Sequence, residues 1–149
     1  MPLEAVSIRR VLQARRALVF EAWTRPELMA RWFFPDSTWT ATIEHELRVG
    51  GRWQVLMREP SGVTHDQFGE YREIVPSSRL VFTWNCPDLK VVDSVVTVEL
   101  FDHEAGTELT LNHELPADPN VRRGHDEGWQ ACLGNLQQLL ETPVEETRT

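Results

Sequence analysis

Long apolar runs are absent from this sequence, and its first ten residues, MPLEAVSIRR, place no apolar segment behind their charges. A membrane-spanning helix needs about 18 or more apolar residues in succession, and a secretory signal needs an apolar stretch after a basic start. We therefore expect no membrane span, no signal peptide and a cytoplasmic location.

Cysteine and basic residues are also scarce. The two cysteines, Cys86 and Cys132, lie far apart and belong to no CxxC or Cys/His motif, which indicates buried thiols rather than a disulfide or a metal site. Lysine and arginine number 15 against 23 aspartates and glutamates, which gives a formal net charge of -8. Because such a surface repels a phosphate backbone, nucleic acid is excluded as a class of partner.

Motifs that carry catalysis or cofactor binding elsewhere are missing too. The chain contains no GxSxG nucleophile motif, no HExxH zinc motif and no glycine-rich strand-to-helix loop for phosphate. The one glycine pair, Gly50-Gly51, is typical of a hairpin turn. We therefore expect no cofactor and no metal, and we assign no catalytic residue. Whether the protein is an enzyme stays open, with the balance toward a non-enzymatic role.

The composition that remains is that of one globular domain. The 149 residues are 41% hydrophobic and 26% charged, and they contain no repeat, low-complexity run or internal linker. We expect a single domain over residues 1–141, followed by a flexible polar tail over residues 142–149.

Hydrophobic spacing predicts the order of the elements. Alternation predicts a strand over residues 6–11, and helical spacing predicts a helix over residues 15–23. Thr24-Arg25-Pro26-Glu27 fits a capping box for a second helix that ends by Pro35. Over residues 39–114 apolar and polar residues alternate between short turns, and such turns join antiparallel strands. We therefore expect an α+β fold, in which a curved antiparallel sheet has one apolar face.

A long helix is predicted over residues 118–141, with Asp118-Pro119 at its start. Gly124, Gly128 and Gly134 lie off its apolar stripe and weaken the helix. Close approach of another backbone, such as that of a second subunit, would account for them, and a homodimer is one expected partner. The stripe consists of His125, Trp129, Cys132, Leu133, Leu136 and Leu140.

A curved sheet covered by one helix leaves part of its concave face to be filled. The strand and helix positions that face inward hold large aromatic side chains, which either line a pocket for a ligand or fill the core themselves. Trp32-Phe33-Phe34-Pro35 adds three aromatic residues, with Trp32 expected in the core and Phe33 or Phe34 at the cavity mouth. The inward rings are Trp53, Phe82, Trp84 and, from the helix, Trp129.

Three further side chains offer polar contacts in such a pocket. His113 shares its parity with inward leucines, His125 lies one turn before Trp129, and Tyr71 is expected to point inward from a strand of ambiguous parity. If the two imidazoles face a pocket, they orient a ligand or act as acid and base. The alternative is that each is a hydrogen-bonded residue of the core. The expected ligand site consists of Trp32, Trp53, Tyr71, Phe82, Trp84, His113, His125 and Trp129.

Seven segments form a recognisable series along nearly the whole chain: Val19-Phe20-Glu21-Ala22-Trp23-Thr24-Arg25-Pro26-Glu27-Leu28, Arg31-Trp32 with Pro35, Leu47-Arg48-Val49-Gly50-Gly51-Arg52-Trp53, Gly69-Glu70-Tyr71-Arg72-Glu73-Ile74-Val75-Pro76, Arg79-Leu80-Val81-Phe82-Thr83-Trp84, Gly106-Thr107-Glu108-Leu109-Thr110-Leu111, and His125-Asp126-Glu127-Gly128-Trp129. In this order they resemble the START/SRPBCC (helix-grip) superfamily, in the branch named after the activator of the heat-shock protein 90 ATPase. The resemblance implies a strand, two short helices, six antiparallel strands and a C-terminal helix that closes a cavity.

The resemblance leaves three functions open, because one fold hosts many activities. The superfamily binds lipids, sterols, polyketides and plant hormones, so the leading hypothesis is non-enzymatic binding of a small hydrophobic or amphipathic molecule or a lipid. The second is an enzyme of the polyketide cyclase or hydrolase kind, in which His113, His125 and Tyr71 lie within hydrogen-bonding reach of one another. The third is a chaperone-interacting or regulatory module. It is the least favoured, because chaperone activation in the family depends on an additional N-terminal domain.

Overall fold

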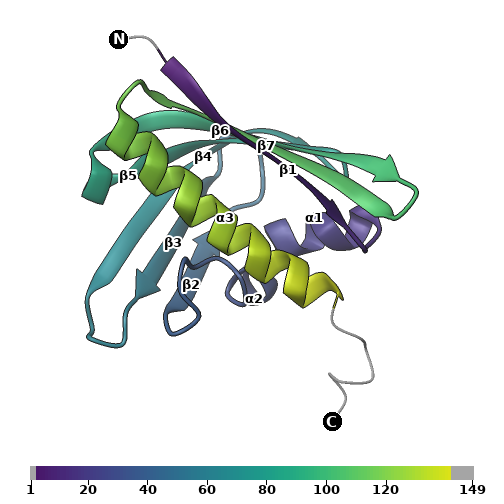
Figure 1. Cartoon of the computed structure of the whole chain (residues 1–149), viewed down its shortest axis with the longest axis horizontal. Helices are drawn as coiled ribbons and strands as arrows, with labels where there is room; N and C mark the ends of the chain where they lie inside the picture. Colours follow the sequence, from purple (N-terminus) through teal and green to yellow (C-terminus); the bar gives the residue numbers. More distant parts are fainter. Residues whose placement is uncertain (1–2, 142–149) are drawn as a thin grey trace.

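The computed structural model describes residues 3–141, without the side chains of residues 3 and 4, so the tail predicted over residues 142–149 lies outside the described residues. The elements follow the predicted order, and Figure 1 labels them along the chain. Their bounds are β1 (Leu3–Leu12), α1 (Arg16–Thr24), α2 (Pro26–Met29), β2 (Thr40–His45), β3 (Arg52–Arg58), β4 (Thr64–Val75), β5 (Arg79–Cys86), the 3₁₀ turn η1 (Pro87–Leu89), β6 (Val91–His103), β7 (Gly106–Pro116) and α3 (Pro119–Glu141).

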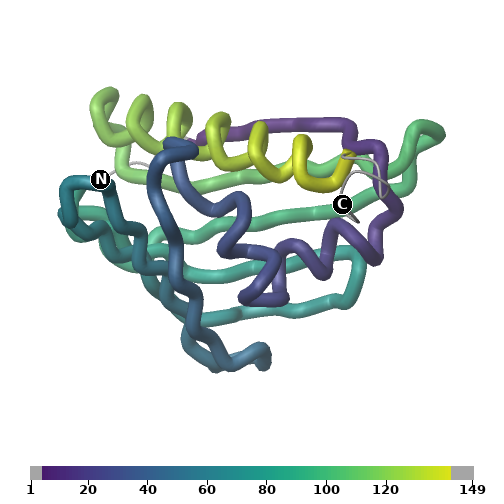
Figure 2. The backbone as a smooth tube through the Cα atoms, turned by 90° about the horizontal axis from the view of Figure 1, so that it is seen from below, coloured from purple at the N-terminus to yellow at the C-terminus, as the bar shows by residue number. Residues whose placement is uncertain are grey.

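The seven strands form one sheet in the order β1-β7-β6-β5-β4-β3-β2, and every neighbouring pair is antiparallel. Short reversals connect β2 to β7, as the turn residues predict. The sheet twists strongly, so that in Figure 2 the strands at the β2 end run steeply across those at the β1 end. The helix α3 lies across the sheet, as Figure 1 shows, and this confirms the predicted α+β helix-grip fold.

The start of α3 is fixed by a side-chain cap at the predicted place. The Oδ1 atom of Asp118 accepts hydrogen bonds from the backbone N–H groups of Asn120 (2.9 Å) and Val121 (3.4 Å). These donors have no partner within the helix, so the cap stabilises its first turn. The helix then buries a continuous stripe of His125, Trp129, Cys132, Leu133 and Leu136 against the sheet, while Leu140 is half-buried.

The capping box predicted at Thr24 is wrong. Thr24 is the last residue of α1, and its hydroxyl donates to the Phe20 carbonyl at 2.8 Å, inside that helix. Arg25 is the residue before α2 and provides no side-chain cap. The Glu27 carboxylate pairs with the Arg25 guanidinium at 2.6 Å instead of reaching back to the backbone of Thr24. The first helix therefore extends one residue further than expected, and the threonine hydroxyl is bonded within this helix and does not cap the next one.

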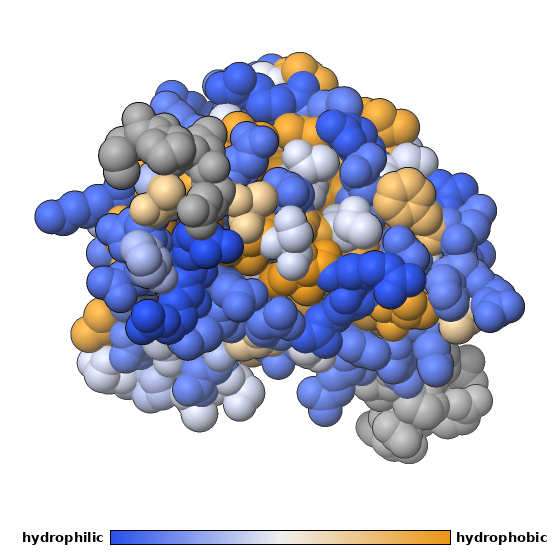
Figure 3. Space-filling view, turned by 45° about the horizontal axis from the view of Figure 1, so that its top comes forward, coloured by the Kyte–Doolittle hydropathy of each residue, from blue (hydrophilic) through white to orange (hydrophobic). Residues whose placement is uncertain are grey.

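The surface agrees with the acidic composition. Figure 3 shows one face of the molecule on which hydrophilic residues cover most of the area, with hydrophobic residues visible in patches between them. Within residues 3–141, no helix combines the length and the apolar character that crossing a bilayer requires.

Candidate ligand-binding cavity

A cavity of about 240 Å³ lies between α3, the strands β3 to β5 and the segment that follows α2. Its walls are mainly apolar and include the rings of Phe33, Trp84 and Trp129 together with Met57 and Cys132. Residues at its mouth are exposed to solvent, among them Pro35, Leu89 and Gly124. A concave, ring-lined space with an opening is the usual form of a small-molecule site.

Two of the three α3 glycines explain the space. Gly124 and Gly128 lie one turn apart and both line the cavity. A Cβ atom at Gly128 would meet no atom within 4 Å, and one at Gly124 would meet only the side chain of Leu89, at 3.3 Å. Among residues 3–141, no backbone outside α3 comes within 4 Å of the Cβ position at either glycine. Their missing side chains therefore widen the cavity, at a cost to helix propensity of about 1 kcal/mol each relative to alanine.

A hydrogen-bonded chain of rings forms the inner wall and extends behind it into the core. The Trp84 indole N–H donates to Nε2 of His125 at 3.2 Å, and Nδ1–H of His125 donates to the Val121 carbonyl at 2.9 Å. The Trp129 indole N–H donates to Nδ1 of His113 at 3.1 Å. That bond leaves Nε2 as the protonated nitrogen of His113, and Nε2–H donates to the Ser94 hydroxyl at 2.8 Å. Both imidazoles are therefore neutral and fully hydrogen-bonded.

Burial keeps these imidazoles neutral across the physiological range. Loss of hydration, with a smaller repulsive contribution from His125, lowers the pKa of His113 to about 3. Burial likewise lowers the pKa of His125. A catalytic acid or base works best with a pKa near the operating pH and with a nitrogen free to meet the substrate. His113 has neither property, and it is fully buried.

Tyr71 lies away from the two inner histidines. It is buried and points inward, and its hydroxyl pairs with Nδ1 of His45 at 2.7 Å. Its ring borders a void of only about 10 Å³, shared with Trp53 and Phe82, which is separate from the larger cavity. Tyr71 therefore does not line the cavity into which His125 faces.

The eight residues expected at the ligand site fall into three groups. Trp84, His125 and Trp129 line the cavity. Trp53, Tyr71 and Phe82 border the small void, so that part of the concave face is filled by packed rings. Trp32 and His113 lie wholly in the core, and the Trp32 indole N–H donates to the Ala22 carbonyl at 2.9 Å.

A charged cluster that sequence reasoning did not identify stands at the cavity mouth. His65 on β4 lies between two carboxylates, with Nε2 bonded to Glu59 at 2.5 Å and Nδ1 bonded to Asp88 of η1. The hydrogen bonds that the His65 ring donates to Asp88 and Glu59 raise the pKa of His65 above its usual value, which favours the imidazolium. The Trp39 ring stacks on this imidazole, with centroids 4.8 Å apart and planes 6° apart. The cluster ties β4 to η1 and to the segment before β2.

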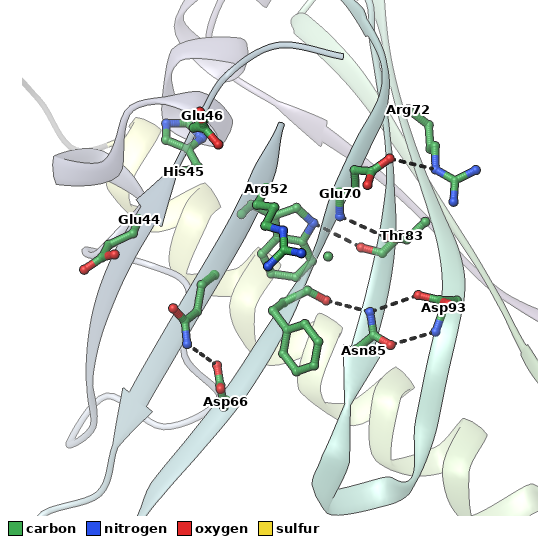
Figure 4. Close-up of a pocket in the computed structure, with 14 residues that line it drawn as sticks. Glu44, His45, Glu46, Arg52, Asp66, Glu70, Arg72, Thr83, Asn85 and Asp93 are labelled. Atoms are coloured by element: carbon green, nitrogen blue, oxygen red, sulfur yellow. Dashed lines mark hydrogen bonds and ion pairs between the residues drawn. The ribbon is translucent and has the colours of Figure 1, made fainter. Parts of the chain in front are cut away.

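A larger hollow of about 690 Å³ lies on the outer, polar face of β2 to β5, and Figure 4 shows it. Its labelled side chains are mostly charged, and Arg52 projects over the middle of it while Asn85 binds Asp93. An apolar ligand would leave much of its surface in water there, so the inner cavity is the better candidate. Among residues 3–141, no three His, Cys, Asp or Glu side chains are grouped so as to hold a metal ion.

Comparisons with known proteins agree with this architecture. The family described as activator of Hsp90 ATPase homolog 1-like protein matches residues 13–141. A crystal structure of a Chromobacterium violaceum protein superposes with a TM-score of 0.84 and 29% sequence identity, covering 93% of this chain and 98% of that one. A Nitrosomonas europaea protein gives 0.77 and 26%, with 97% of each chain covered.

A third similar structure is the solution structure of an AHSA1-like protein from Aeromonas hydrophila, which superposes with a TM-score of 0.81 over 93% of this chain and 92% of that one. Its sequence identity of 24% supports a likeness of fold alone. No protein of curated function matches the sequence significantly. With its family match over residues 13–141 and its helix-grip fold, the chain belongs to the activator of Hsp90 ATPase homolog 1-like family of the START/SRPBCC superfamily.

Proposed function

We propose that the protein binds a small hydrophobic or amphipathic molecule in the cavity between α3 and the sheet. The observation that carries this proposal is the ring-lined space of about 240 Å³, which opens to solvent beside two helix glycines. Packed protein interiors leave few voids larger than a water molecule, so a space of this size at a solvent opening is suited to a guest.

The size of the cavity narrows the choice of guest. A volume of about 240 Å³ is below the roughly 300–1,000 Å³ of sites for drug-sized ligands. It exceeds the roughly 150 Å³ of an engineered apolar cavity that holds benzene. One ring or two fused rings therefore suit the space, and an intact lipid does not fit within it.

The geometry favours binding over catalysis. The cyclase-like alternative requires Tyr71 to lie beside His113 and His125. In the structure the Tyr71 hydroxyl pairs with His45 instead. The two imidazoles already use both of their nitrogens within the protein.

The cytoplasmic location and the homodimer stay predictions from the sequence, which cell fractionation and light scattering would check.

Ligand binding is expected to raise the melting temperature. At a ligand concentration 100 times the Kd, the free energy of unfolding increases by about 2.7 kcal/mol. For a chain of this size that corresponds to about 5–10 °C. A thermal-shift screen with one- and two-ring aromatic molecules, followed by native mass spectrometry of the hits, measures it. If no ring-sized molecule stabilises the protein, the proposal is wrong.

A further inference from the structure

One polar side chain in the wall of the cavity has an unused hydrogen-bonding group. Gln67 on β4 lines the cavity and is 5% exposed. Its Nε2 donates to Sγ of Cys86 at 3.8 Å, a weak contact. Its Oε1 is buried and accepts no hydrogen bond from any residue that the structure describes. A buried amide oxygen without a donor costs about 1–3 kcal/mol, so such groups are rare in native proteins.

The ring nitrogens of Trp84, Trp129 and His125 have no such vacancy. The indole N–H groups of Trp84 and Trp129 are both donated to histidines. Nε2 of His125 accepts from Trp84, and its Nδ1–H is bound to a backbone carbonyl. Gln67 therefore presents a buried hydrogen-bond acceptor that a ligand can satisfy. Its last side-chain torsion is broad, so rotation about it allows the oxygen to meet an occupant of the cavity.

The charge of the lining sets a second limit on the ligand. Among the described residues that line the cavity there is no lysine or arginine, and Asp88 is the one carboxylate. The imidazolium of His65 has both nitrogens bonded to carboxylates. An anionic ligand would find no cationic donor free to meet it, and burying an unpaired charge is costly.

We infer that the ligand is a ring-sized molecule without negative charge and with an N–H or O–H group that donates a hydrogen bond to the side-chain oxygen of Gln67. This inference rests on the proposed binding function and defines the chemistry of the guest. The apolar walls bind the ring system, and Gln67 selects for the donor. A site built to hydrogen-bond one group of a ligand discriminates against an analogue that lacks it, because the buried partner is then left unpaired.

The test compares indole, which has an N–H donor, with 1-benzothiophene, which has nearly the same shape and no donor. Isothermal titration calorimetry on the wild type is expected to show indole binding on the order of tenfold more tightly. Gln67→Met keeps the length of the side chain and removes the oxygen, so it is expected to abolish this preference while 1-benzothiophene still binds. Gln54→Met is the matched control, because Gln54 lies on the neighbouring strand and lines the hollow on the outer face of the sheet.

Each outcome decides between the two proposals. Equal affinity of the wild type for both probes overturns the role of Gln67 and leaves cavity binding intact. A preference for indole that persists in Gln67→Met overturns the assignment to this residue. Binding of neither probe counts against both proposals. NMR of the Gln67 side-chain amide, shifted differently by indole and by 1-benzothiophene in the wild type, gives a readout that does not depend on the folding of the variant.

Discussion

Lowering the pH from 7.5 to 5 is expected to destabilise the protein by about 2 kcal/mol through His113 alone. The imidazole is neutral in the folded protein, because burial lowers its pKa to about 3. In the unfolded chain it titrates near pH 6.5. Between these two pKa values the imidazole binds a proton in the unfolded state and not in the folded state, so the free energy of unfolding falls as the pH falls. The contribution is fully present above pH 6.5 and is lost on the way down to pH 3.

Other histidines act on the same titration. Burial lowers the pKa of His125 and of His45, so both add to the loss of stability at acidic pH. His65 works in the opposite direction, because Asp88 and Glu59 raise its pKa. The stability that this pairing contributes is complete below the pKa of His65 in the unfolded chain. It is lost as the pH rises through the pKa of His65 in the folded protein. Three histidines against one predict a net loss of stability below pH 6.5.

Urea unfolding at a series of pH values measures this loss. In His113→Gln the slope of the unfolding free energy against pH is expected to fall by up to about 1.4 kcal/mol per pH unit over pH 6 to 5. Ser94→Ala is the matched control, because it removes the hydroxyl partner of His113 and keeps the titrating ring. The slope separates titration from the general damage that either substitution does. NMR titration showing His113 protonated near pH 6.5 in the folded protein would contradict the prediction.

The sheet and the long helix were predictable because periodicity reports which side of an element is buried. The strand β4 shows where that information ends. Its register shifts between Tyr71 and Glu73, so Gln67 and Tyr71 point inward before the shift while Ile74 packs against the core after it. Both parities competed in the sequence for this reason, and the cavity side chain Gln67 was not identified.

Which inward rings meet a cavity and which meet each other also lay beyond the sequence. Parity places Trp53 and Trp84 on the same face, and their centroids are 5.4 Å apart, but of these two rings Trp84 alone lines the cavity of about 240 Å³ beside α3. The curvature of the sheet and the position of α3 decide this, and both depend on contacts between distant residues. The cluster of His65, Glu59 and Asp88 likewise joins three separate segments. Gly124 and Gly128 were a local signal of open space, although the sequence alone suggested close approach of another backbone.

Filling the space beside Gly128 is expected to abolish ligand binding while stabilising the fold. In Gly128→Leu the new Cβ meets no atom within 4 Å, and the leucine side chain extends into the cavity. Leaving glycine for a good helix former contributes about 1 kcal/mol, and burial of the apolar side chain adds to it. A ring and a leucine cannot share the space, so affinity for any cavity ligand is expected to fall by about 100-fold.

Gly134→Leu separates the two effects. Gly134 lies on the same helix, a Cβ atom there also meets no atom within 4 Å, and it does not line the cavity. This control is expected to gain the same helix propensity and to keep wild-type affinity. The measurements are the melting temperature and the affinity for the best ring-sized ligand of the thermal-shift screen. Because Gly128→Leu is expected to melt above the wild type, its loss of binding cannot be attributed to misfolding. Wild-type affinity in that variant would mean that the ligand binds elsewhere, and the outer groove of Figure 4 would then be the next site to test.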